Sequence, residues 1–184
     1  MLGFADEVWW SRFAQPDLHA WAGGGPLRLV QREADQGDDP DPKALACYGL
    51  FLRAEGRMML RFVDGRPVSA VTCDFLAWAC GRLAAEGKTA LLLVWDNAAW
   101  HVSKAVRAWV KAHNRAARTG GGVRILACRL PVKAPWLNPI EPKWVHGKRA
   151  VVEPDQKLTA GELKQRICDY YGCDLLEPIA QKVA

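Results

Sequence analysis

The sequence predicts an α/β protein built on one mixed sheet, with an antiparallel start, parallel crossovers and flanking helices. Three observations lead to this prediction. Strand-like apolar runs follow one another from the first residues to about residue 65. Beyond that point helical and strand-like patterns alternate, which is typical of parallel crossover connections. The length of 184 residues, half of them apolar, suits a single domain with a sizeable core.

The first part of the chain is expected to form three antiparallel strands. MLGFADEVWWSRFAQ (1–15) reads as a strand, and LHAWAGGG (18–25) as a second strand that closes in a glycine turn and forms a hairpin with the first. An acidic loop follows over residues 35–42. Residues 44–56 predict the third strand, and RMMLRFVDG (57–65) is either its partner or an extension of it.

The second part alternates helices with strands. Apolar residues recur at helical spacing from about Ser69 to Ala85. The uniformly apolar TALLLVWD (89–96) predicts a strand buried on both faces. Ser103 can cap a helix that runs to about Arg118. After a glycine-rich turn, VRILACRL (123–130) predicts another strand.

The last part predicts two further helical segments. A proline-rich loop over residues 131–142 leads into a helical turn that Gly147 can terminate. Thr159 and Glu162 form a capping box for a final helix. Its apolar stripe consists of Leu163, Ile167 and Tyr170.

Composition restricts the classes of function. The formal net charge of +5 and the pI of about 9.0 suit a polyanionic partner, although an ordinary solvated surface explains them as well. Five of the basic residues share one helical stripe: Lys104, Arg107, Lys111, Arg115 and Arg118. The six cysteines form no CxxC pair, which argues against a zinc ribbon and favours reduced, buried side chains in a cytoplasmic protein. No signal peptide opens the sequence, and no apolar run approaches the ~20 residues that span a bilayer.

Three acidic residues lie where the chain changes direction. Asp6 and Asp96 end apolar, strand-like runs, and Glu141 opens a turn into a helix. Strand ends are where α/β sheets place their ligands. Carboxylates gathered there can hold Mg²⁺ or Mn²⁺, and two such ions can activate a nucleophile and stabilise the leaving oxygen of a phosphodiester. Structural interpretations stay open: Asp96 can bond the amides of the next turn, Asp6 can be a solvated acid, and Glu141 can favour the positive end of its helix.

The segments around these acids resemble a known family. GFADEVWWSRFAQP, VWDNAAWH and PVKAPWLNPIEPKW are similar to the three acidic motifs of DDE transposases, in particular the bacterial insertion-sequence group of the mariner-like superfamily. LNPIEPKW is the most specific piece. The resemblance extends from residue 1 to about residue 170 and implies a ribonuclease-H-like mixed sheet. It also implies that Asp6, Asp96 and Glu141 are catalytic residues that hold two Mg²⁺ or Mn²⁺ ions.

The resemblance further implies a reaction and partners. The reaction is metal-dependent cleavage of DNA at element ends, followed by strand transfer of the freed 3′-hydroxyl into target DNA. The partners are double-stranded DNA and a second copy of the chain, in the bacterial cytoplasm and at the nucleoid during activity. Further residues are expected to support the metal ligands or contact DNA, with local turn hydrogen bonds as the alternative for the first three: Asn97, His101, Asn138, Lys133, Lys143, His146 and Lys148.

The expected organisation is a single DDE catalytic domain over residues 1–184. Family members carry a helix-turn-helix DNA-binding region ahead of this domain, and the sequence lacks one, so a separately encoded N-terminal half is an expected partner. Two other functions stay open. The chain can be a ribonuclease-H-like nuclease without strand transfer, or a truncated transposase remnant that binds only DNA or a partner.

Overall fold

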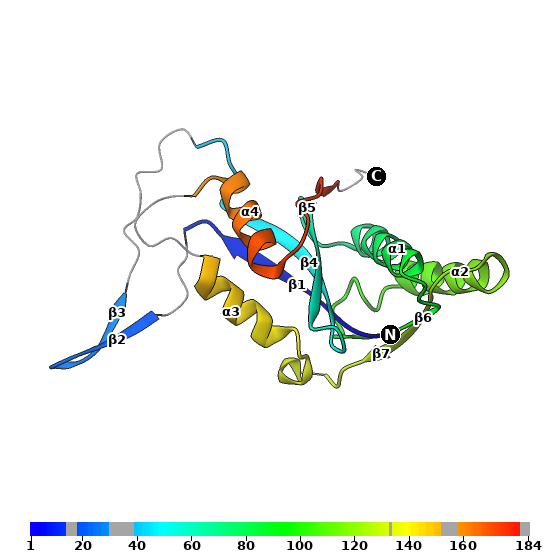
Figure 1. The fold of residues 1–184 in the computed structure, drawn as a ribbon, viewed down its shortest axis with the longest axis horizontal. Helices are drawn as coiled ribbons and strands as arrows, with labels where there is room; N and C mark the ends of the chain where they lie inside the picture. Colours follow the sequence, from blue (N-terminus) through cyan, green and yellow to red (C-terminus); the bar gives the residue numbers. More distant parts are fainter. Residues whose placement is uncertain (14–17, 30–38, 133, 152–157, 181–184) are drawn as a thin grey trace.

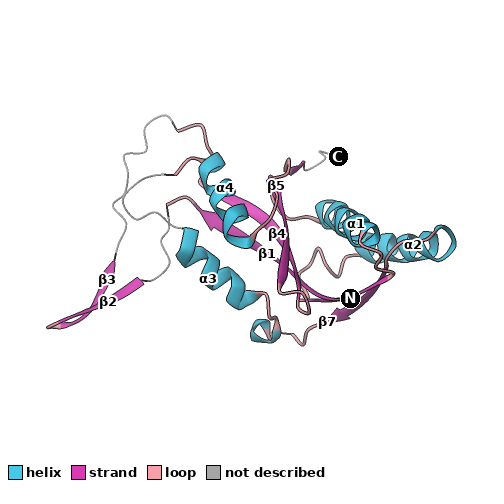
Figure 2. Cartoon of the chain, in the orientation of Figure 1, coloured by secondary structure: helices cyan, strands magenta, loops and turns pink. Residues whose placement is uncertain are grey.

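The computed structural model describes residues 1–13, 18–29, 39–132, 134–151 and 158–180. These residues form a six-stranded mixed sheet with helices on both faces, and a separate two-stranded sheet (Figures 1 and 2). The elements follow the chain in this order: β1 (Leu2–Ser11), β2 (Leu18–Ala22), β3 (Gly25–Leu29), β4 (Ala44–Leu52), β5 (Arg57–Asp64), α1 (Ser69–Ala85), β6 (Ala90–Trp95), α2 (Lys104–Gly120), β7 (Arg124–Arg129), the 3₁₀ turn η1 (Pro135–Leu137), α3 (Glu141–Val151), α4 (Ala160–Tyr171) and β8 (Ile179–Ala180).

The main sheet has the strand order β7-β6-β1-β4-β5-β8. Strands β1, β4 and β5 pair antiparallel, whereas β6 runs parallel to both β1 and β7. The predicted fold class, three antiparallel strands followed by parallel crossovers, is therefore confirmed. The pairing of β4 with β5 also decides that residues 57–65 are a partner strand and not an extension. The short strand β8, which pairs parallel with β5, was not predicted.

The first predicted hairpin is wrong. β2 pairs with β3, with Ala22 opposite Gly25, and β1 pairs with β4 instead. The turn residues Gly23 and Gly24 explain the difference, because a two-glycine turn lets the chain fold straight back on itself. Figure 1 shows this hairpin projecting away from the main sheet. Of the acidic loop 35–42, only residues 39–42 lie within the described part of the chain.

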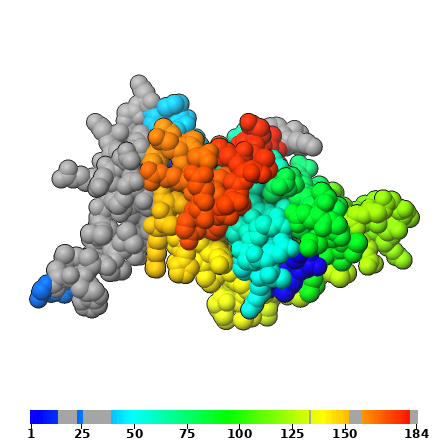
Figure 3. All heavy atoms as spheres, in the orientation of Figure 1, coloured from blue at the N-terminus to red at the C-terminus, as the bar shows by residue number. Residues whose placement is uncertain are grey.

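Each face of the main sheet has its own core. Because strand side chains alternate, Ala5 points into the core beneath α1 and α2, whereas Phe4 and Val8 point into the core beneath α3 and α4. The helices α3 and α4 lie side by side on the second face (Figure 3). Position 6 belongs to the same face of β1 as Phe4 and Val8. The fold therefore directs Asp6 toward α3.

The second core covers only part of the sheet. Its buried strand residues come from β1, β4 and β5, and from β6 the partly buried Val94 packs against it. Leu92 of β6 is 42% exposed, and its partner Leu126 of β7 is 54% exposed. The prediction that residues 89–96 are buried on both faces is therefore wrong.

Gly147 does not end α3, which continues to Val151. A Cβ atom at position 147 would collide with Tyr171 and approach Trp10, so this glycine permits close packing within the helix. The capping box of Thr159 and Glu162 is confirmed. In α4, Leu163 and Ile167 are buried as expected, whereas Tyr170 is half-exposed.

Two smaller predictions can also be compared with the described residues. The cysteines are free, and most are buried or half-buried, but Cys128 on the edge strand β7 is exposed. The five basic residues of the helical stripe are exposed on α2. Among the described helices, none combines the length and apolar character that a bilayer crossing requires.

Candidate catalytic site

Asp6 and Asp96 come from neighbouring parallel strands. β1 and β6 are in register up to Phe4 and Val94, and each aspartate lies two residues beyond that pair. Because side chains alternate along a strand, both aspartates belong to the sheet face that α3 covers. Asp96 directly follows the last residue of β6, at the carboxyl edge of the strand.

Glu141 is the first residue of α3, and Asn138 fixes that helix end to β1. Asn138 Nδ2 donates to the carbonyl of Ala5 over 3.2 Å, while the amide of Glu141 donates to the carbonyl of Asn138 over 3.1 Å. Asn138 is 2% exposed, and Ile140 is fully buried in the second core. Glu141 is thus attached to the strand that carries Asp6 by a buried amide and an apolar anchor. This placement makes Asn138 a link between β1 and α3.

Asp6 lies in a pocket of negative charge. Trp144 Nε1 donates to Asp6 Oδ2 over 3.0 Å. Burial, followed by the charges of Glu7 and Glu141, raises the pKa of Asp6 from 3.8 to about 7 despite that hydrogen bond. Within the described part of the chain, the charges that act on Asp6 are therefore negative.

Asp96 has the opposite environment. Asp96 Oδ1 accepts hydrogen bonds from the amide of Ala98 over 2.9 Å and from His101 Nδ1 over 2.7 Å. The hydrogen bond from His101 outweighs partial burial and holds the pKa of Asp96 below its usual value. Burial and then the charge of Asp96 raise the pKa of Glu141, and Lys148 opposes them. Glu141 therefore interacts electrostatically with both aspartates.

Glu7 belongs to this region and was not among the predicted residues. Its Oε1 lies 2.6 Å from His101 Nε2, and its Oε2 accepts from Trp100 Nε1 over 3.1 Å. Burial opposes the charged form of His101, but Asp96 and Glu7 together raise its pKa to about 9. The feature of the sequence that could have indicated Glu7 is its position next to Asp6 in β1. Because side chains alternate along a strand, the two acids lie on opposite faces of the sheet. The partner of Glu7 lies 94 residues away, so no local pattern could reveal it.

The donor set suits a hard divalent cation. All three acids offer oxygen, which Mg²⁺ and Mn²⁺ prefer, and the raised pKa of Asp6 indicates negative charge that a cation would compensate. Within the described ranges, however, no three His, Cys, Asp or Glu side chains converge closely enough to hold an ion. His101 engages Asp96 Oδ1 in this arrangement.

The remaining predicted residues that the structure describes lie at two places, after the end of β6 and on α3. Asn97 Nδ2 donates to the carbonyl of Leu130 over 2.7 Å, and so it ties the end of β6 to the end of β7. On α3, Lys148 affects Glu141, Lys143 lies 5.0 Å above the ring of Phe51, and His146 is exposed. Lys133 lies outside the described residues.

Charge is unevenly distributed around these acids. Residues 97–151 contain 11 of the 25 lysines and arginines but only one of the 20 acids, Glu141. This stretch therefore carries a formal charge of +10, and the rest of the chain carries −5. It includes α2, β7 and α3. Such asymmetry is typical of a surface that binds a polyanion.

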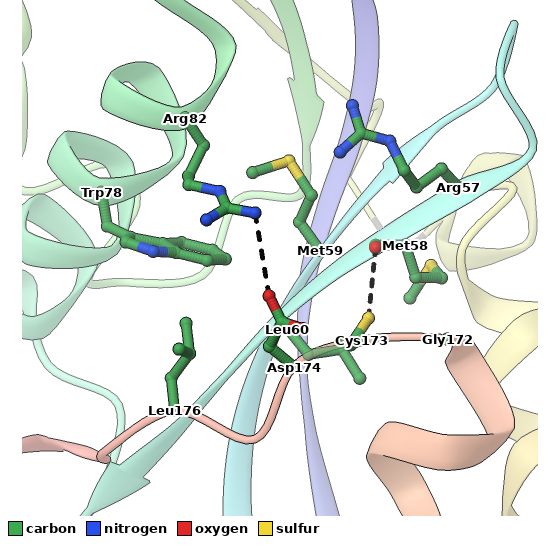
Figure 4. Close-up of a pocket in the computed structure, with 10 residues that line it drawn as sticks. All are labelled: Arg57, Met58, Met59, Leu60, Trp78, Arg82, Gly172, Cys173, Asp174 and Leu176. Carbon is green, nitrogen blue, oxygen red and sulfur yellow. Dashed lines mark hydrogen bonds and ion pairs between the residues drawn. The ribbon is translucent and has the colours of Figure 1, made fainter. Parts of the chain in front are cut away.

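A hollow with an empty volume of about 450 Å³ lies away from the acids, between β5, α1 and the segment after α4 (Figure 4). Two of its lining residues are arginines. Arg57 already pairs with Glu55 and Glu86 at 2.8 and 2.6 Å, and Arg82 lies 3.8 Å from Asp174. The hollow contains none of the three acids, and carboxylates already engage its cations.

The strand order, with three antiparallel strands followed by parallel crossovers, is that of a ribonuclease-H-like fold. The chain belongs to the DDE superfamily endonuclease family, whose model matches residues 43–163. That match includes Asp96 and Glu141, and Asp6 precedes it.

Solved structures show the same fold. The Mos1 transposase paired-end complex with left transposon end has a TM-score of 0.66 and 13% identity, over 94% of this chain and 48% of that one. The Mos1 mariner paired-end complex with Mn has a TM-score of 0.65 and 13% identity, over 93% and 48%. For the Mos1 strand transfer complex the values are 0.61 and 11%, over 94% and 47%. The chain spans about half the length of these structures. No curated protein matches it.

Proposed function

We propose that this chain is the catalytic core of a transposase that cuts DNA at the ends of a mobile element and joins the cut strand to target DNA. The observation that carries the proposal is the placement of three acids at one edge of the sheet: Asp6 and Asp96 lie on neighbouring parallel strands, and Asn138 ties the start of α3, with Glu141, to β1. Membership of the DDE endonuclease family supports it. So does the likeness in fold to transposase complexes whose titles include transposon ends, manganese and strand transfer.

In this proposal Asp6, Asp96 and Glu141 hold two Mg²⁺ or Mn²⁺ ions. Bound ions would activate the attacking oxygen and stabilise the leaving oxygen of the phosphodiester. The side chains supply the geometry: Asn138 fixes Glu141 against β1, and Trp144 orients Asp6 through its indole N–H. Because His101 holds one oxygen of Asp96, that carboxylate would reach an ion through its other oxygen.

Double-stranded DNA is the proposed substrate. The basic stretch 97–151 supports it, since lysines and arginines near the acids would neutralise phosphates and give salt-dependent affinity. Lys143, His146 and Lys148 are the proposed contacts on α3, together with Lys133. We propose that the active form is a dimer and that choice of the element ends depends on a helix-turn-helix region in further polypeptide. In a bacterial cell this activity would be exercised at the nucleoid.

The test is a cleavage and joining assay in Mn²⁺ and in Mg²⁺. Nicking of supercoiled plasmid measures cleavage, and a labelled duplex with a free 3′-hydroxyl measures joining to the plasmid. We expect both reactions in the parent protein and neither in Asp96→Asn or Glu141→Gln. Glu55→Gln is the matched control, because Glu55 forms ion pairs with Arg57 and Lys88 at the β4–β5 turn.

The outcomes separate the alternatives. Cleavage without joining identifies a ribonuclease-H-like nuclease, and DNA binding without either reaction identifies a non-catalytic remnant. Cleavage that survives Asp96→Asn in a folded protein contradicts the role of the three acids.

A further inference from the structure

We infer that Glu7 is a positioning residue for this site, because it fixes His101, and His101 in turn fixes Asp96. The inference rests on the proposed function. It assigns a role to a carboxylate that is adjacent in sequence to Asp6 but lies on the other face of β1. The hydrogen bonds of Glu7 reach Asp96 through His101.

The contacts form one continuous path. Glu7 Oε1 lies 2.6 Å from His101 Nε2, and His101 Nδ1 lies 2.7 Å from Asp96 Oδ1. Each ring nitrogen faces a carboxylate oxygen, so both nitrogens donate. The second oxygen of Glu7 accepts from Trp100 over 3.1 Å. Every polar atom of Glu7 and of the imidazole is therefore used within this path.

The imidazole is also held by stacking and burial. Its ring lies parallel to Trp95, with centroids 4.6 Å apart and an interplanar angle of 14°. The ring of Trp100 meets it edge-on. The side chains of His101 and Glu7 are 1% and 7% exposed. Burial this deep argues against direct contact of His101 with DNA and favours a role in orienting Asp96.

Asp96 needs such support more than its neighbours do. Its side chain is 47% exposed, and it follows the last residue of β6, where the sheet no longer fixes the backbone. Its two donors are the amide of Ala98 and His101. A half-exposed carboxylate with one backbone donor could rotate toward solvent. The path from Glu7 therefore selects one orientation of the carboxylate and leaves its other oxygen for a ligand.

A purely stabilising role for the Glu7–His101 pair is the competing explanation, and the two make different predictions. Groups that orient metal ligands typically affect metal affinity or activity about 10- to 100-fold when removed. If the path is real, the effect of removing Glu7 depends on His101. A stabilising pair would change the unfolding temperature and leave the affinity of the folded protein for Mn²⁺ unchanged.

The experiment is a double-mutant cycle read out by Mn²⁺ affinity, measured by electron paramagnetic resonance in the full chain. We expect Glu7→Ala to weaken Mn²⁺ binding about tenfold and Glu7→Gln to weaken it less, because the amide keeps an acceptor for His101. In a His101→Ala background, Glu7→Ala should add less than about a twofold change. Glu55→Ala is the matched control and should leave the affinity unchanged. If Glu7→Ala does not fold, Glu7→Gln compared with Glu7→Gln/His101→Ala gives the same cycle.

The result that overturns the inference is an equal loss of affinity on removal of Glu7 with and without His101, or no loss in either background. Its failure is distinguishable from failure of the proposed function. If the parent binds Mn²⁺ and Asp96→Asn abolishes binding, but Glu7 variants bind normally, only the positioning role is lost. If the parent itself binds no Mn²⁺, the proposed function fails as well.

Discussion

Asp6 and Asp96 occupy neighbouring strands of one sheet, yet their surroundings are opposite. Asp6 lies beneath α3 with a single side-chain donor, the indole of Trp144, and its pKa is raised to about 7. Asp96 is half-exposed and receives hydrogen bonds from a backbone amide and from His101, and its pKa is lowered. The protein thus compensates the charge of one aspartate and leaves the other uncompensated.

This difference assigns separate tasks to two regions of the site. The region of Asp96, His101 and Glu7 is complete within the protein, since a cationic imidazole lies between two carboxylates. The region of Asp6 and Glu141 has excess negative charge, so an added cation would lower its energy most. We therefore expect the Asp96 region to be preorganised and the Asp6 region to change most when metal binds.

Neutral substitution of the two aspartates should have the largest effects. Loss of a metal ligand removes several kcal/mol of transition-state stabilisation, so we expect Asp6→Asn and Asp96→Asn each to slow cleavage on the order of a thousandfold or more. The two substitutions should change the free energy of unfolding in opposite directions. At pH 8 without metal, Asp6→Asn should raise the free energy of unfolding by roughly 1–3 kcal/mol because it removes a buried, repelled charge.

Asp96→Asn should instead lower the free energy of unfolding by about 1 kcal/mol or less, because Asp96 is half-exposed and solvent screens its interaction with His101. Urea denaturation in EDTA measures both variants. If the two substitutions changed stability in the same direction, the two regions would not differ in charge compensation.

Removal of the partner groups gives the next largest effect. His101→Ala removes the cationic partner of the buried carboxylate of Glu7, which keeps its hydrogen bond from Trp100, and we expect a cost of roughly 3–4 kcal/mol. Trp144→Phe removes one hydrogen bond to Asp6 and should cost about 1 kcal/mol. Chemical denaturation of the two variants measures the ratio of the two losses in stability. Similar losses would contradict the view that the protein itself completes only the Asp96 region.

The sequence predicted the parts of this site that depend on local patterns. The apolar run before Asp96 predicted a strand end, and the blocks around Asp96 and Glu141 carried the resemblance to the DDE family. Gly147 was misread because the contact that requires a glycine comes from Tyr171 of another helix. The exposure of Leu92 on β6 was missed for a similar reason, since the buried strand residues of the second core come from β1, β4 and β5.

The role of Glu7 could not be predicted from the sequence. Its neighbour Asp6 was identified by resemblance, but alternation along β1 turns Glu7 to the other face. There its partners come from the loop after β6. Nothing in the residues around Glu7 encodes that loop, because the pairing follows from β6 lying beside β1.

Stability without metal should fall as pH rises, for two separable reasons. The folded-state pKa of Asp6 is about 7 instead of 3.8, so the folded protein holds that proton more tightly, and the resulting stability is lost between about pH 4 and 7. The folded-state pKa of His101 is about 9 instead of 6.5, so its contribution is present below pH 6.5 and is lost as pH rises through 9. We expect each group to contribute on the order of 3–4 kcal/mol, the free-energy equivalent of these pKa differences.

Denaturation at a series of pH values measures the slope of the free energy of unfolding against pH. Asp6→Asn should flatten it below pH 7, and His101→Ala should flatten it above. Added Mn²⁺ should also remove the lower part, because a bound cation favours ionised Asp6. A parent protein that grows more stable from pH 5 to pH 9 would show that the two groups are not charged as inferred.

The last effect we predict concerns the glycine that gives Trp144 access to Asp6. Gly49 of β4 lies directly opposite Asp6 in the antiparallel pair, and a Cβ atom there would collide with the indole of Trp144. Gly49→Ala should therefore displace Trp144 from Asp6 Oδ2 at a cost of about 1–2 kcal/mol. The contacts of Asp96 lie on β6 and the loop that follows, so they should persist. Thermal unfolding and Mn²⁺ affinity measure the two consequences.

Gly3→Ala is the matched control, because its Cβ would meet the flexible side chains of Leu50 and Leu91 and not a group of the site. Weaker Mn²⁺ binding in Gly49→Ala alone would show that the indole helps to hold Asp6 in place, whereas equal binding in both variants would restrict Trp144 to packing.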